Sequence, residues 1–421
     1  MKKVLWLTNV RFSEEKIKTS GTWLQPLAEA LYNSGKYEIY HITRDKCVQE
    51  ILQETCRGIK QYVIPIKRNF KKIALQIPDI ETCENVKAIV NSINPDLIHV
   101  WGTESPWFCM QSMGIFDGHK VLLDVQGVMR ACYEFYYGGL TFFHRWQTVG
   151  LREIIAPFTS LFYIRWKFGK WGRTEERILR AYDYISVQSE WTKNRLSILQ
   201  LNANLYHTKR MLRDDFYRVK WKKCEHASPV IFTSSSAAIP YKGFHILVKA
   251  CAILKKKYPD FVLKIAGAFT KRRLGLRSGY TNYVLRLIKQ YNLVSNVQFL
   301  GSISSDEIIK HQMESDICVI PSFVESYCLA FAEAMMIGMP CVVAYAGAMP
   351  TIAKDKEEAI FFNSMDYVDC AAKIIEVFEK KELMTMISKN GRNRRLQDND
   401  KALVLQTQLL IYEDILVPNK S

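Results

Sequence analysis

The sequence predicts an α/β protein made of two doubly wound domains, and three observations support this fold class. The chain has 421 residues, which is too long for one ordinary core and fits two domains. Short, almost wholly apolar segments alternate with helical stretches, a pattern typical of parallel strands covered by helices on both faces. The pattern restarts after a polar, basic stretch at residues 220–228, which we interpret as a linker.

The first half of the chain carries five predicted strands with helices between them. The strands are expected at residues 4–7, 38–42, 97–100, 121–125 and 184–187. Two of the intervening helices are expected at residues 23–32 and 83–91. Ligands of such sheets bind at the carboxyl ends of the strands, so the loops that follow these strands are the candidate binding loops.

The second half repeats this arrangement. Its strands are expected at residues 230–232, 261–266, 297–300, 317–320 and 341–344, and its helices at residues 243–256, 280–291, 305–315 and 329–337. A last apolar helix at residues 402–416 is expected to pack back on the first domain. We therefore predict domains at residues 1–215 and 216–398, followed by a C-terminal helical segment at residues 399–421.

Charge and cysteine content limit the classes of partner. The net charge of +16 favours polyanionic partners such as phosphorylated ligands or an anionic membrane surface. Nucleic acid is not expected, because the sequence has no recognition module and no clustered basic helix. The 11 cysteines include no Cys-x-x-Cys pair, which indicates reduced thiols in a cytoplasm and argues against a zinc site.

A loop acid and a helix acid form the first motif. A buried strand is expected to end at Pro321, the following loop carries Glu325, and a helix opens near Cys328. The unpaired N–H groups in the first turn of that helix attract phosphate. Glu333 lies inside the apolar helix, where a carboxylate needs a partner such as a ribose diol. The spacing alone leaves an alternative equally open, in which Glu325 is solvated and Glu333 pairs with a Lys or Arg.

Small residues followed by a lysine form the second motif, at residues 234–243. The segment follows the first strand of the second domain and precedes a helix. Its small residues, among them Ser236, let the backbone approach a ligand, and Lys242 presents a cation that suits a departing diphosphate. Taken alone, the motif is better interpreted as a flexible surface loop with an exposed lysine.

Loops of the first domain carry further polar residues. Gly21 follows the first strand and permits close approach to a ligand, although no Gly-x-Gly-x-x-Gly fingerprint is present. Trp101 and Glu104 follow another predicted strand, and Gln126 follows the next. Glu104 and Gln126 are placed to meet a substrate, whereas His99, inside its strand, is interpreted as a core histidine.

The stretch from Arg145 to Arg173 mixes basic residues with aromatic and aliphatic ones. Such mixtures suit a membrane interface, and peripheral contact with an anionic membrane is one interpretation. The alternative, which we favour on the sequence alone, is a helix packed on its own domain with a solvated basic edge.

Taken in order, these motifs resemble the large family of retaining glycosyltransferases with the GT-B fold (glycosyl transferases group 1). The resemblance covers most of the chain and is strongest from Lys242 to about Phe362. Its main features are Tyr241-Lys242-Gly243, Ile265-Ala266-Gly267, Val297 to Gly301, Pro321-Ser322 and the series from Glu325 to Met335 with its Glu-x7-Glu spacing. It implies two Rossmann-like domains facing across a cleft, with the acceptor on the first and the nucleotide sugar on the second.

The resemblance also implies a set of site residues. Lys242, Glu325 and Gln126 would be catalytic, and Trp101 and Glu104 would meet the acceptor. Donor binding would involve Gly21, Ser236, Lys242, Gly267, Gly301, Ile303, Glu325, Tyr327, Cys328, Leu329 and Glu333. Within this set Lys242 would contact the diphosphate, Glu333 the ribose and Glu325 the transferred sugar.

Two positions depart from the family pattern. The family commonly has an arginine on the phosphates where this chain has Ala237, and another basic residue, such as Lys271 or Arg272, would have to replace it. Family members often have a histidine where this chain has Gln126, which can still hydrogen-bond a sugar hydroxyl.

The expected protein is a cytoplasmic retaining glycosyltransferase that needs no cofactor or metal. Peripheral contact with the inner face of the membrane stays open beside the packed-helix interpretation. It would move a hexose-type sugar from a nucleoside-diphosphate sugar to a glycan or lipid-linked glycan in polysaccharide biosynthesis. Two alternatives remain open. One is a catalytically silent nucleotide-sugar-binding protein, suggested by Ala237 and Gln126, and the other is a nucleotide-sugar epimerase of the same fold.

Overall fold

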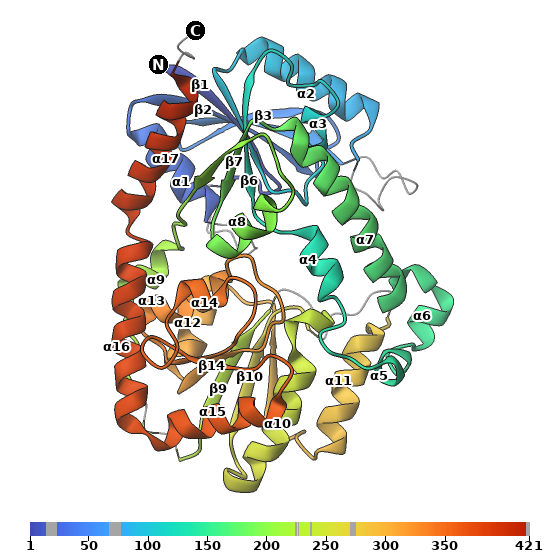
Figure 1. Cartoon of the computed structure of the whole chain (residues 1–421), viewed down its shortest axis with the longest axis vertical. Coiled ribbons are helices and arrows are strands. Elements are labelled where there is room, and N and C mark those ends of the chain that lie inside the picture. Colours follow the sequence, from blue (N-terminus) through green and yellow to red (C-terminus); the bar gives the residue numbers. More distant parts are fainter. Residues whose placement is uncertain are drawn as a thin grey trace. The chain divides into compact units, whose positions relative to one another are not determined.

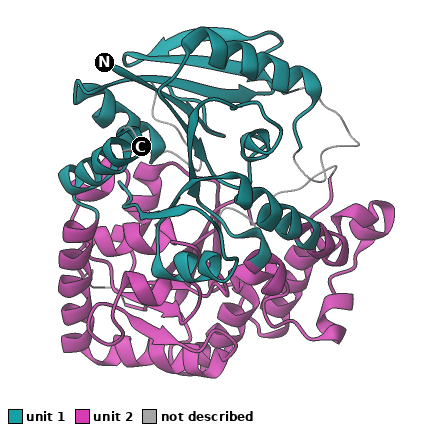
Figure 2. Cartoon of the chain, turned by 45° about the horizontal axis from the view of Figure 1, so that its top comes forward, with its two compact units in different colours: residues 1–130, 169–211, 399–421 teal, residues 131–168, 212–398 magenta. Residues whose placement is uncertain are grey.

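The computed structural model describes residues 1–13, 23–66, 77–223, 225, 227–235, 238–269 and 275–417. The chain divides into two compact α/β units (Figure 2). Unit 1 comprises residues 1–130, 169–211 and 399–421, and unit 2 comprises residues 131–168 and 212–398. Each unit contains one sheet with helices packed against it (Figure 1).

The sheet of unit 1 has eight strands in the order β3-β4-β2-β1-β5-β6-β7-β8. All neighbours are parallel except β3 and β4, which pair antiparallel as a hairpin. The strands are β1 Lys2–Leu7, β2 Tyr37–Asp45, β3 Leu52–Cys56, β4 Ile59–Pro65, β5 Leu97–Trp101, β6 Lys120–Val125, β7 Tyr184–Val187 and β8 Asn204–His207. The central strands β1 and β5 are buried almost throughout, as their apolar sequences predict.

Helices of unit 1 connect these strands. They are α1 Leu24–Asn33, α2 Ile80–Ile93, α3 Trp107–Gln111, η2 Leu179–Ala181, α8 Glu190–Ser197 and α17 Lys401–Leu416. Helix α4, Met129–Glu134, begins in unit 1 and ends in unit 2, because the division falls after residue 130. The start of α2 is fixed by the Asp79 carboxylate, which accepts a hydrogen bond from the Thr82 N–H at 2.8 Å. The helix ends at Asn94, which takes a left-handed conformation with φ 48°.

The sheet of unit 2 has six parallel strands in the order β11-β10-β9-β12-β13-β14. The strands are β9 Val230–Ser234, β10 Val262–Ala266, β11 Val297–Gly301, β12 Ile317–Ile320, β13 Cys341–Ala344 and β14 Ile360–Phe362. Its helices are α5 Phe142–Trp146, α6 Leu151–Ile155, η1 Pro157–Thr159, α9 Asp214–Arg218, η3 Pro240–Lys242, α10 Phe244–Lys257, α11 Gly279–Gln290, α12 Ser305–Met313, α13 Leu329–Ile337, α14 Met349–Ile352, α15 Tyr367–Glu379 and α16 Lys381–Asp398. Helix α7, Leu161–Ile178, contributes its first half to unit 2 and its second half to unit 1.

The division into units differs from the predicted boundary at residue 215, because residues 131–168 group with unit 2. Contacts explain this grouping. The Glu153 carboxylate on α6 accepts a hydrogen bond from the Gly279 N–H at the start of α11, at 3.0 Å. A β-carbon on Gly279 would lie 1.5 Å from the Thr148 carbonyl oxygen, so only glycine permits this approach. Helices α5, α6 and α11 therefore lie side by side (Figure 1).

The C-terminal helix α17 returns to the first sheet, as expected. Its Tyr412 hydroxyl accepts a hydrogen bond from the Trp6 Nε1–H at 2.9 Å and lies 2.7 Å from the His99 Nδ1 atom. His99 is completely buried, and burial lowers its pKa well below the usual value, which confirms a core histidine. Among the described residues, no helix is long and apolar enough to cross a bilayer.

Candidate functional site

The loop after β9 is drawn against the end of β12 by Gly243. This glycine has φ 72°, and a β-carbon there would lie only 1.8 Å from the Pro321 carbonyl oxygen. The Phe323 N–H donates to the Tyr241 carbonyl at 2.7 Å, which ties the two loops together. The close approach sets Lys242 beside the loop that follows β12.

Lys242 and Glu325 form an ion pair, with the lysine Nζ atom 2.6 Å from the glutamate Oε1 atom. Their side chains are 21% and 14% exposed, so both are largely withdrawn from water but remain accessible. Burial works against the charge on Lys242, but the Glu325 carboxylate outweighs it and raises the lysine pKa above its ordinary value. Lys242 therefore stays a cation at neutral pH.

A second glycine fixes the Glu325 backbone. A β-carbon on Gly347, which has φ 56°, would lie 2.3 Å from the Glu325 carbonyl oxygen. The Ala348 N–H donates to the same carbonyl oxygen at 2.8 Å. The loop after β13 thus packs on the backbone of the loop after β12, and Glu325 is held from both sides.

Helix α13 begins directly after this loop. Its N-cap residue, Cys328, has φ 67° and ψ 76°, a left-handed conformation that is uncommon for residues other than glycine. The Cys328 thiol is buried, and burial raises its pKa well above the usual value, so the thiol is neutral. Tyr327 and Leu329, on either side, are partly buried against the core. The N-terminus of α13, which is the positive end of the helix dipole, thus follows the ion-paired Glu325 within a few residues of the chain.

Glu333, on α13, is buried and is held by Arg213, which lies just before α9. The guanidinium donates two hydrogen bonds to the carboxylate, from Nε at 2.7 Å and from Nη2 at 2.6 Å. Burial raises the Glu333 pKa, and Arg213 partly offsets this effect. The structure thus shows the pairing with a basic residue that the spacing left open, and one face of the Glu333 carboxylate is taken by Arg213.

Gly267 and Gly301 lie at the carboxyl ends of neighbouring strands β10 and β11. The Gly267 N–H donates to the Gly301 carbonyl at 2.6 Å. A β-carbon on Gly267 would lie 1.7 Å from the Ser235 carbonyl oxygen, whereas one on Gly301 would meet nothing within 4 Å. Gly267 is therefore required for packing, Gly301 faces open space, and Ile303 is half-buried after it. These residues share one edge of the sheet with Lys242 and Glu325.

Some predicted positions lie outside the described residues. They are Gly21, Ser236, Ala237, Lys271 and Arg272.

The predicted residues of the first domain lie at the corresponding sheet edge of unit 1. Trp101, at the end of β5, is almost fully buried between Trp6 and Trp23, with ring centroids 4.6 and 5.5 Å away. Gln126 directly follows β6 and is half-buried. Glu104 lies after β5, and its Oε2 atom is buried with no hydrogen-bond partner among the described residues. Burial is the main cause that raises the Glu104 pKa to about 7.

A second buried acid, Glu175 on α7, joins the loops after β5 and β6. Its Oε2 atom accepts from the Met129 N–H at 2.9 Å, and its Oε1 atom lies 2.5 Å from the Thr103 hydroxyl. The same hydroxyl lies 2.9 Å from the Gly127 carbonyl. Because Thr103 has one proton to donate, a protonated Glu175 satisfies both contacts. This agrees with burial raising the Glu175 pKa to about 8.

Deeper in unit 1, Arg210 and Asp124 form a fully buried ion pair, with Nη2 2.9 Å from Oδ1. The Asp124 carboxylate also accepts from Ser186 and Gln188, at 2.9 and 3.0 Å. The Arg210 guanidinium stacks 3.6 Å above the Trp23 ring. This cluster connects β6, β7 and the start of α1, and it supports the edge that carries Gln126.

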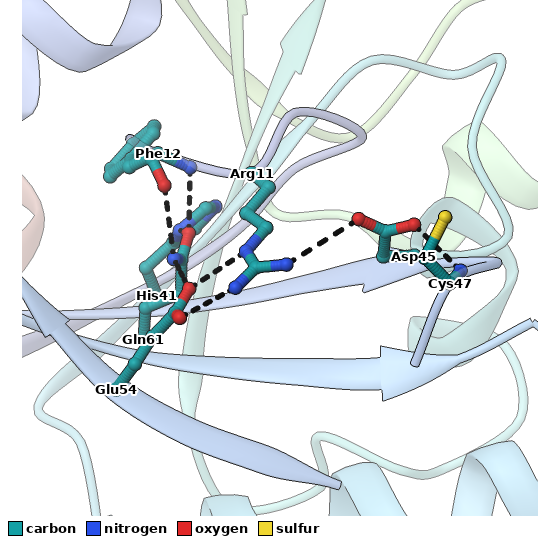
Figure 3. A network of polar contacts seen from close by, with 7 residues as sticks. All are labelled: Arg11, Phe12, His41, Asp45, Cys47, Glu54 and Gln61. Atoms are coloured by element: carbon teal, nitrogen blue, oxygen red, sulfur yellow. Dashed lines mark hydrogen bonds and ion pairs between the residues drawn. The ribbon is translucent and has the colours of Figure 1, made fainter. Parts of the chain in front are cut away.

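A polar network fixes the chain that leaves β1 (Figure 3). Gln61 accepts from the Phe12 N–H at 2.7 Å and lies 2.8 Å from the His41 Nδ1 atom. Arg11 donates two hydrogen bonds to the Glu54 carboxylate, at 2.8 and 2.6 Å. Burial lowers the His41 pKa to about 3, so this histidine is a neutral structural group. The network thus anchors residues 11–13, which precede the segment containing Gly21.

The C-terminal part of the chain, residues 218–394, matches the family model described as Glycosyl transferases group 1. These residues belong to the glycosyl transferases group 1 family. The glycosyl transferases group 1 family is therefore confirmed for this segment, which contains Lys242, Glu325 and Glu333.

Comparison with a relative and with solved structures extends this result. The glycosyltransferase YqgM of Bacillus subtilis (strain 168) is 29% identical over 178 residues, 42% of this chain and 47% of that protein. The chain thus spans about half the length of that relative. Sucrose-phosphate synthase from Thermosynechococcus elongatus superposes with a TM-score of 0.73 at 17% identity, covering 99% of both chains. Anabaena Alr3699/HepE, in complex with UDP and glucose, superposes with a TM-score of 0.65 at 14% identity, covering 99% of this chain and 100% of that one.

These likenesses establish the fold of the chain. The two parallel-sheet units have the GT-B architecture of the solved glycosyltransferases, as predicted. Within the described part of the chain, no group of three or more His, Cys, Asp or Glu side chains could hold a metal ion.

Sequence reasoning missed several residues of the site. Arg213 precedes a short helix 120 positions before Glu333, and Glu175 lies 72 positions after Thr103. No local spacing links such pairs. A buried acid in an apolar helix signals that some cation must approach, but the identity of that cation depends on the fold.

Proposed function

We propose that this protein is a retaining, metal-independent glycosyltransferase that moves a hexose-type sugar from a nucleoside-diphosphate sugar to a glycan or lipid-linked glycan acceptor. The single observation that carries the proposal is the Lys242–Glu325 ion pair, on neighbouring loops at the carboxyl edge of the unit 2 sheet. The family match to residues 218–394 supports it, because it includes both residues. Polysaccharide biosynthesis, at the cytoplasmic face of a membrane, is the setting that we propose.

In this proposal Lys242 stabilises the charge that grows on the departing diphosphate. Its raised pKa keeps it protonated, and its side chain, which is 21% exposed, can turn from Glu325 to a phosphate oxygen. The first-turn N–H groups of α13, from Cys328 and Leu329 onward, add the positive end of a helix dipole. Together they provide charge stabilisation from protein groups alone.

Glu325, released by Lys242 when the phosphates arrive, accepts hydrogen bonds from hydroxyls of the sugar. Arg213 donates one hydrogen bond to each carboxylate oxygen of Glu333, and each oxygen has a further lone pair. With these lone pairs Glu333 accepts hydrogen bonds from the ribose hydroxyls. Arg213 favours the ionised form of the buried Glu333 and aligns its carboxylate, so it acts as a positioning residue. The donor side is lined by Gly267, Gly301, Ile303 and Tyr327. The unit 1 edge proposed for the acceptor carries Trp101, Glu104 and Gln126.

The acceptor hydroxyl would attack the face of the sugar from which the diphosphate leaves, and the donor phosphate would take the proton of that hydroxyl.

The decisive experiment measures sugar transfer by variants of the ion pair. Lys242→Ala and Glu325→Ala should each lower kcat/KM by about 100-fold or more, since each removes a charged contact made in the transition state. Lys257→Ala and Glu379→Ala, in an exposed ion pair between α10 and α15, are matched controls and should retain activity. Undiminished turnover in both test variants would refute the proposed roles of Lys242 and Glu325 in sugar transfer.

The donor is found first by a thermal-shift screen of nucleoside diphosphates and their sugars, because a ligand that binds only the folded state raises stability. UDP and UDP-glucose head the panel, because HepE was solved with UDP and glucose. Nucleotide binding without turnover of any donor would favour a silent binding protein. Conversion of the donor without an acceptor would favour an epimerase.

A further inference from the structure

Residues 141–168 of unit 2 carry an unusual number of exposed apolar side chains. They lie on α5, α6, η1 and the first half of α7. Eight large apolar side chains in this stretch are between 47% and 69% exposed: Phe142, Phe143, Trp146, Leu151, Ile154, Ile155, Phe158 and Trp166. Single exposed apolar residues are normal, but such a concentration marks an interaction surface. We call residues 141–168 the α5–α7 surface.

Contacts connect the elements of the α5–α7 surface. The Trp146 ring on α5 lies 6.1 Å from the Phe142 ring and 5.2 Å from the Phe162 ring on α7. Helices α6 and η1 follow each other directly, and α6 packs on α11 through the Glu153 hydrogen bond to Gly279. Helices α5 and α6, the turn η1 and the first half of α7 thus form one group in unit 2 (Figure 1), and the exposed side chains belong to these elements.

The charge of the α5–α7 surface is positive. Its cations are Arg145, Arg152, Arg165 and Lys167. Glu153 is the only acid in residues 141–168, and it is buried, with its oxygens accepting from the Gly150 and Gly279 N–H groups at 3.1 and 3.0 Å. No exposed carboxylate therefore lies within this stretch to repel an anionic surface.

Neighbouring elements add further cations. Helix α11, which packs on α6, carries Arg286 and Lys289 and no acid, and the Arg286 guanidinium donates to the Gln147 carbonyl beside α5. The second half of α7 continues with Lys170, Arg173 and Arg177, which with Thr174 line a shallow cavity of about 260 Å³, and it carries one partly exposed acid, Glu176. Arg145 and Arg165 lie over the Tyr137 and Tyr133 rings, at 3.9 and 4.0 Å from the ring centroids. The cations are thus interleaved with aromatic rings, as in membrane-interface segments.

We propose that the α5–α7 surface docks the protein on an anionic phospholipid bilayer. The exposed aromatic and aliphatic side chains enter the interfacial layer, where burial of their apolar area is favourable. The arginines and lysines stay at the level of the lipid phosphates, where their charges are attracted to the anionic surface. Positive charge and the absence of an exposed acid favour this occupant over a neutral apolar partner. The inference does not depend on the proposed reaction, and it supplies a surface at which a lipid-linked acceptor is available.

The test is flotation of the full-length protein with phosphatidylcholine vesicles that contain or lack phosphatidylglycerol. The wild type should float with the anionic vesicles, more weakly at high salt, because screening reduces the charge contribution. The triple variant Phe142→Ser, Ile154→Ser, Ile155→Ser should bind about tenfold or more weakly, because it removes the apolar insertion. The matched control, Ile80→Ser, Ile198→Ser, Leu410→Ser, replaces side chains that are 71%, 74% and 57% exposed in unit 1 and should bind like the wild type.

Other outcomes overturn the proposal. One is equal flotation of the triple variant and the wild type, and another is no flotation of the wild type with anionic vesicles. Self-association of the wild type that the triple variant abolishes, without vesicle binding, would assign the surface to a second copy of the chain. Transfer to a water-soluble acceptor separates this inference from the proposed function, because the triple variant should retain it.

Discussion

At the scale of single residues, Glu333 shows how a carboxylate is kept inside an apolar helix. Arg213 binds both oxygens of this buried acid. The side chains of Arg213 and Glu333 are only 20% and 8% exposed. Loss of the arginine would leave an uncompensated buried charge, which is far more costly than the loss of a surface ion pair.

Arg213→Ala should therefore lower the free energy of unfolding by about 3–5 kcal/mol, measured by urea denaturation at neutral pH. It should also weaken binding of the nucleotide found in the thermal-shift screen, because the Glu333 carboxylate loses its alignment. Arg218→Ala, at the other end of α9, removes an exposed arginine and should stay within about 0.5 kcal/mol of the wild type. Equal effects of the two substitutions would contradict this account.

The sequence could show that Glu325 and Glu333 lie on one strand–loop–helix segment, but it could not choose their partners. Helix spacing and apolar patterning are local, so α13 was predicted with its observed bounds. The contacts of Glu325 with Lys242 and of Glu333 with Arg213 join positions 83 and 120 residues apart. Such pairs depend on strand order and loop packing, which leave no local pattern.

At the scale of elements, the site depends on glycines that bring loops together. Gly243 and Gly347 allow the loops after β9 and β13 to pack on the loop after β12. The sequence predicted the Tyr241-Lys242-Gly243 turn and the strand before it. The reason for the glycine became visible only in the fold: a β-carbon at this position would collide with the carbonyl oxygen of Pro321, which directly follows β12.

Gly243→Ala should lower kcat/KM by about tenfold or more, because the added methyl would meet the Pro321 carbonyl and displace Lys242. Gly275→Ala is the matched control, since Gly275 also has a positive φ, 77°, but a β-carbon there would meet nothing within 4 Å. Both variants should lose about 1 kcal/mol of stability from the left-handed backbone conformation, and Gly243→Ala should lose more because of the clash with Pro321. Only Gly243→Ala should lose activity, and similar kinetics for the two would refute the packing argument.

Element prediction succeeded where the apolar pattern was strong. Strands β7, β12 and β13 have the predicted bounds, and the other predicted strands differ by a few residues at most. Strands β3, β4, β8 and β14 were not predicted, and three of these lie at the sheet edges. Edge strands such as β3 and β8 are largely exposed, so their sequences lack the continuous apolar run of a central strand.

At the scale of the whole molecule, stability should depend on pH through two buried acids of unit 1. Burial raises the Glu104 pKa to about 7 and the Glu175 pKa to about 8, and unfolding returns both to values near 4.5. The folded state therefore binds more protons between these values, and stability is lost as pH rises from about 5 to 8. Other groups titrate as well, so the effect is best measured as a difference between variants.

Glu104→Gln and Glu175→Gln should flatten the fall in Tm between pH 5 and 8, because each pKa unit removed corresponds to about 1.4 kcal/mol. Glu190→Gln replaces an exposed acid of the same unit and should leave the profile unchanged. A pH profile of the Glu104→Gln, Glu175→Gln double variant that parallels the wild type would exclude these acids as its cause.

The grouping of residues 131–168 with unit 2 could not be predicted from the sequence. The helices of this stretch are short, and their apolar residues gave no indication of which sheet they join. The contact that decides their place is a backbone N–H of Gly279 meeting Glu153, 126 residues earlier. The predicted boundary at residue 215 followed the polar linker, which is a local feature, whereas the compact units follow such distant contacts.

The position of Tyr412 has a consequence for protein synthesis. Trp6 and His99 belong to strands made early, but their hydrogen-bond partner lies on α17, near residue 412. A nascent chain that ends before this helix lacks the cover of β1 and β5, so unit 1 is completed only after unit 2 has left the ribosome. The first unit to be translated is thus the last to be finished.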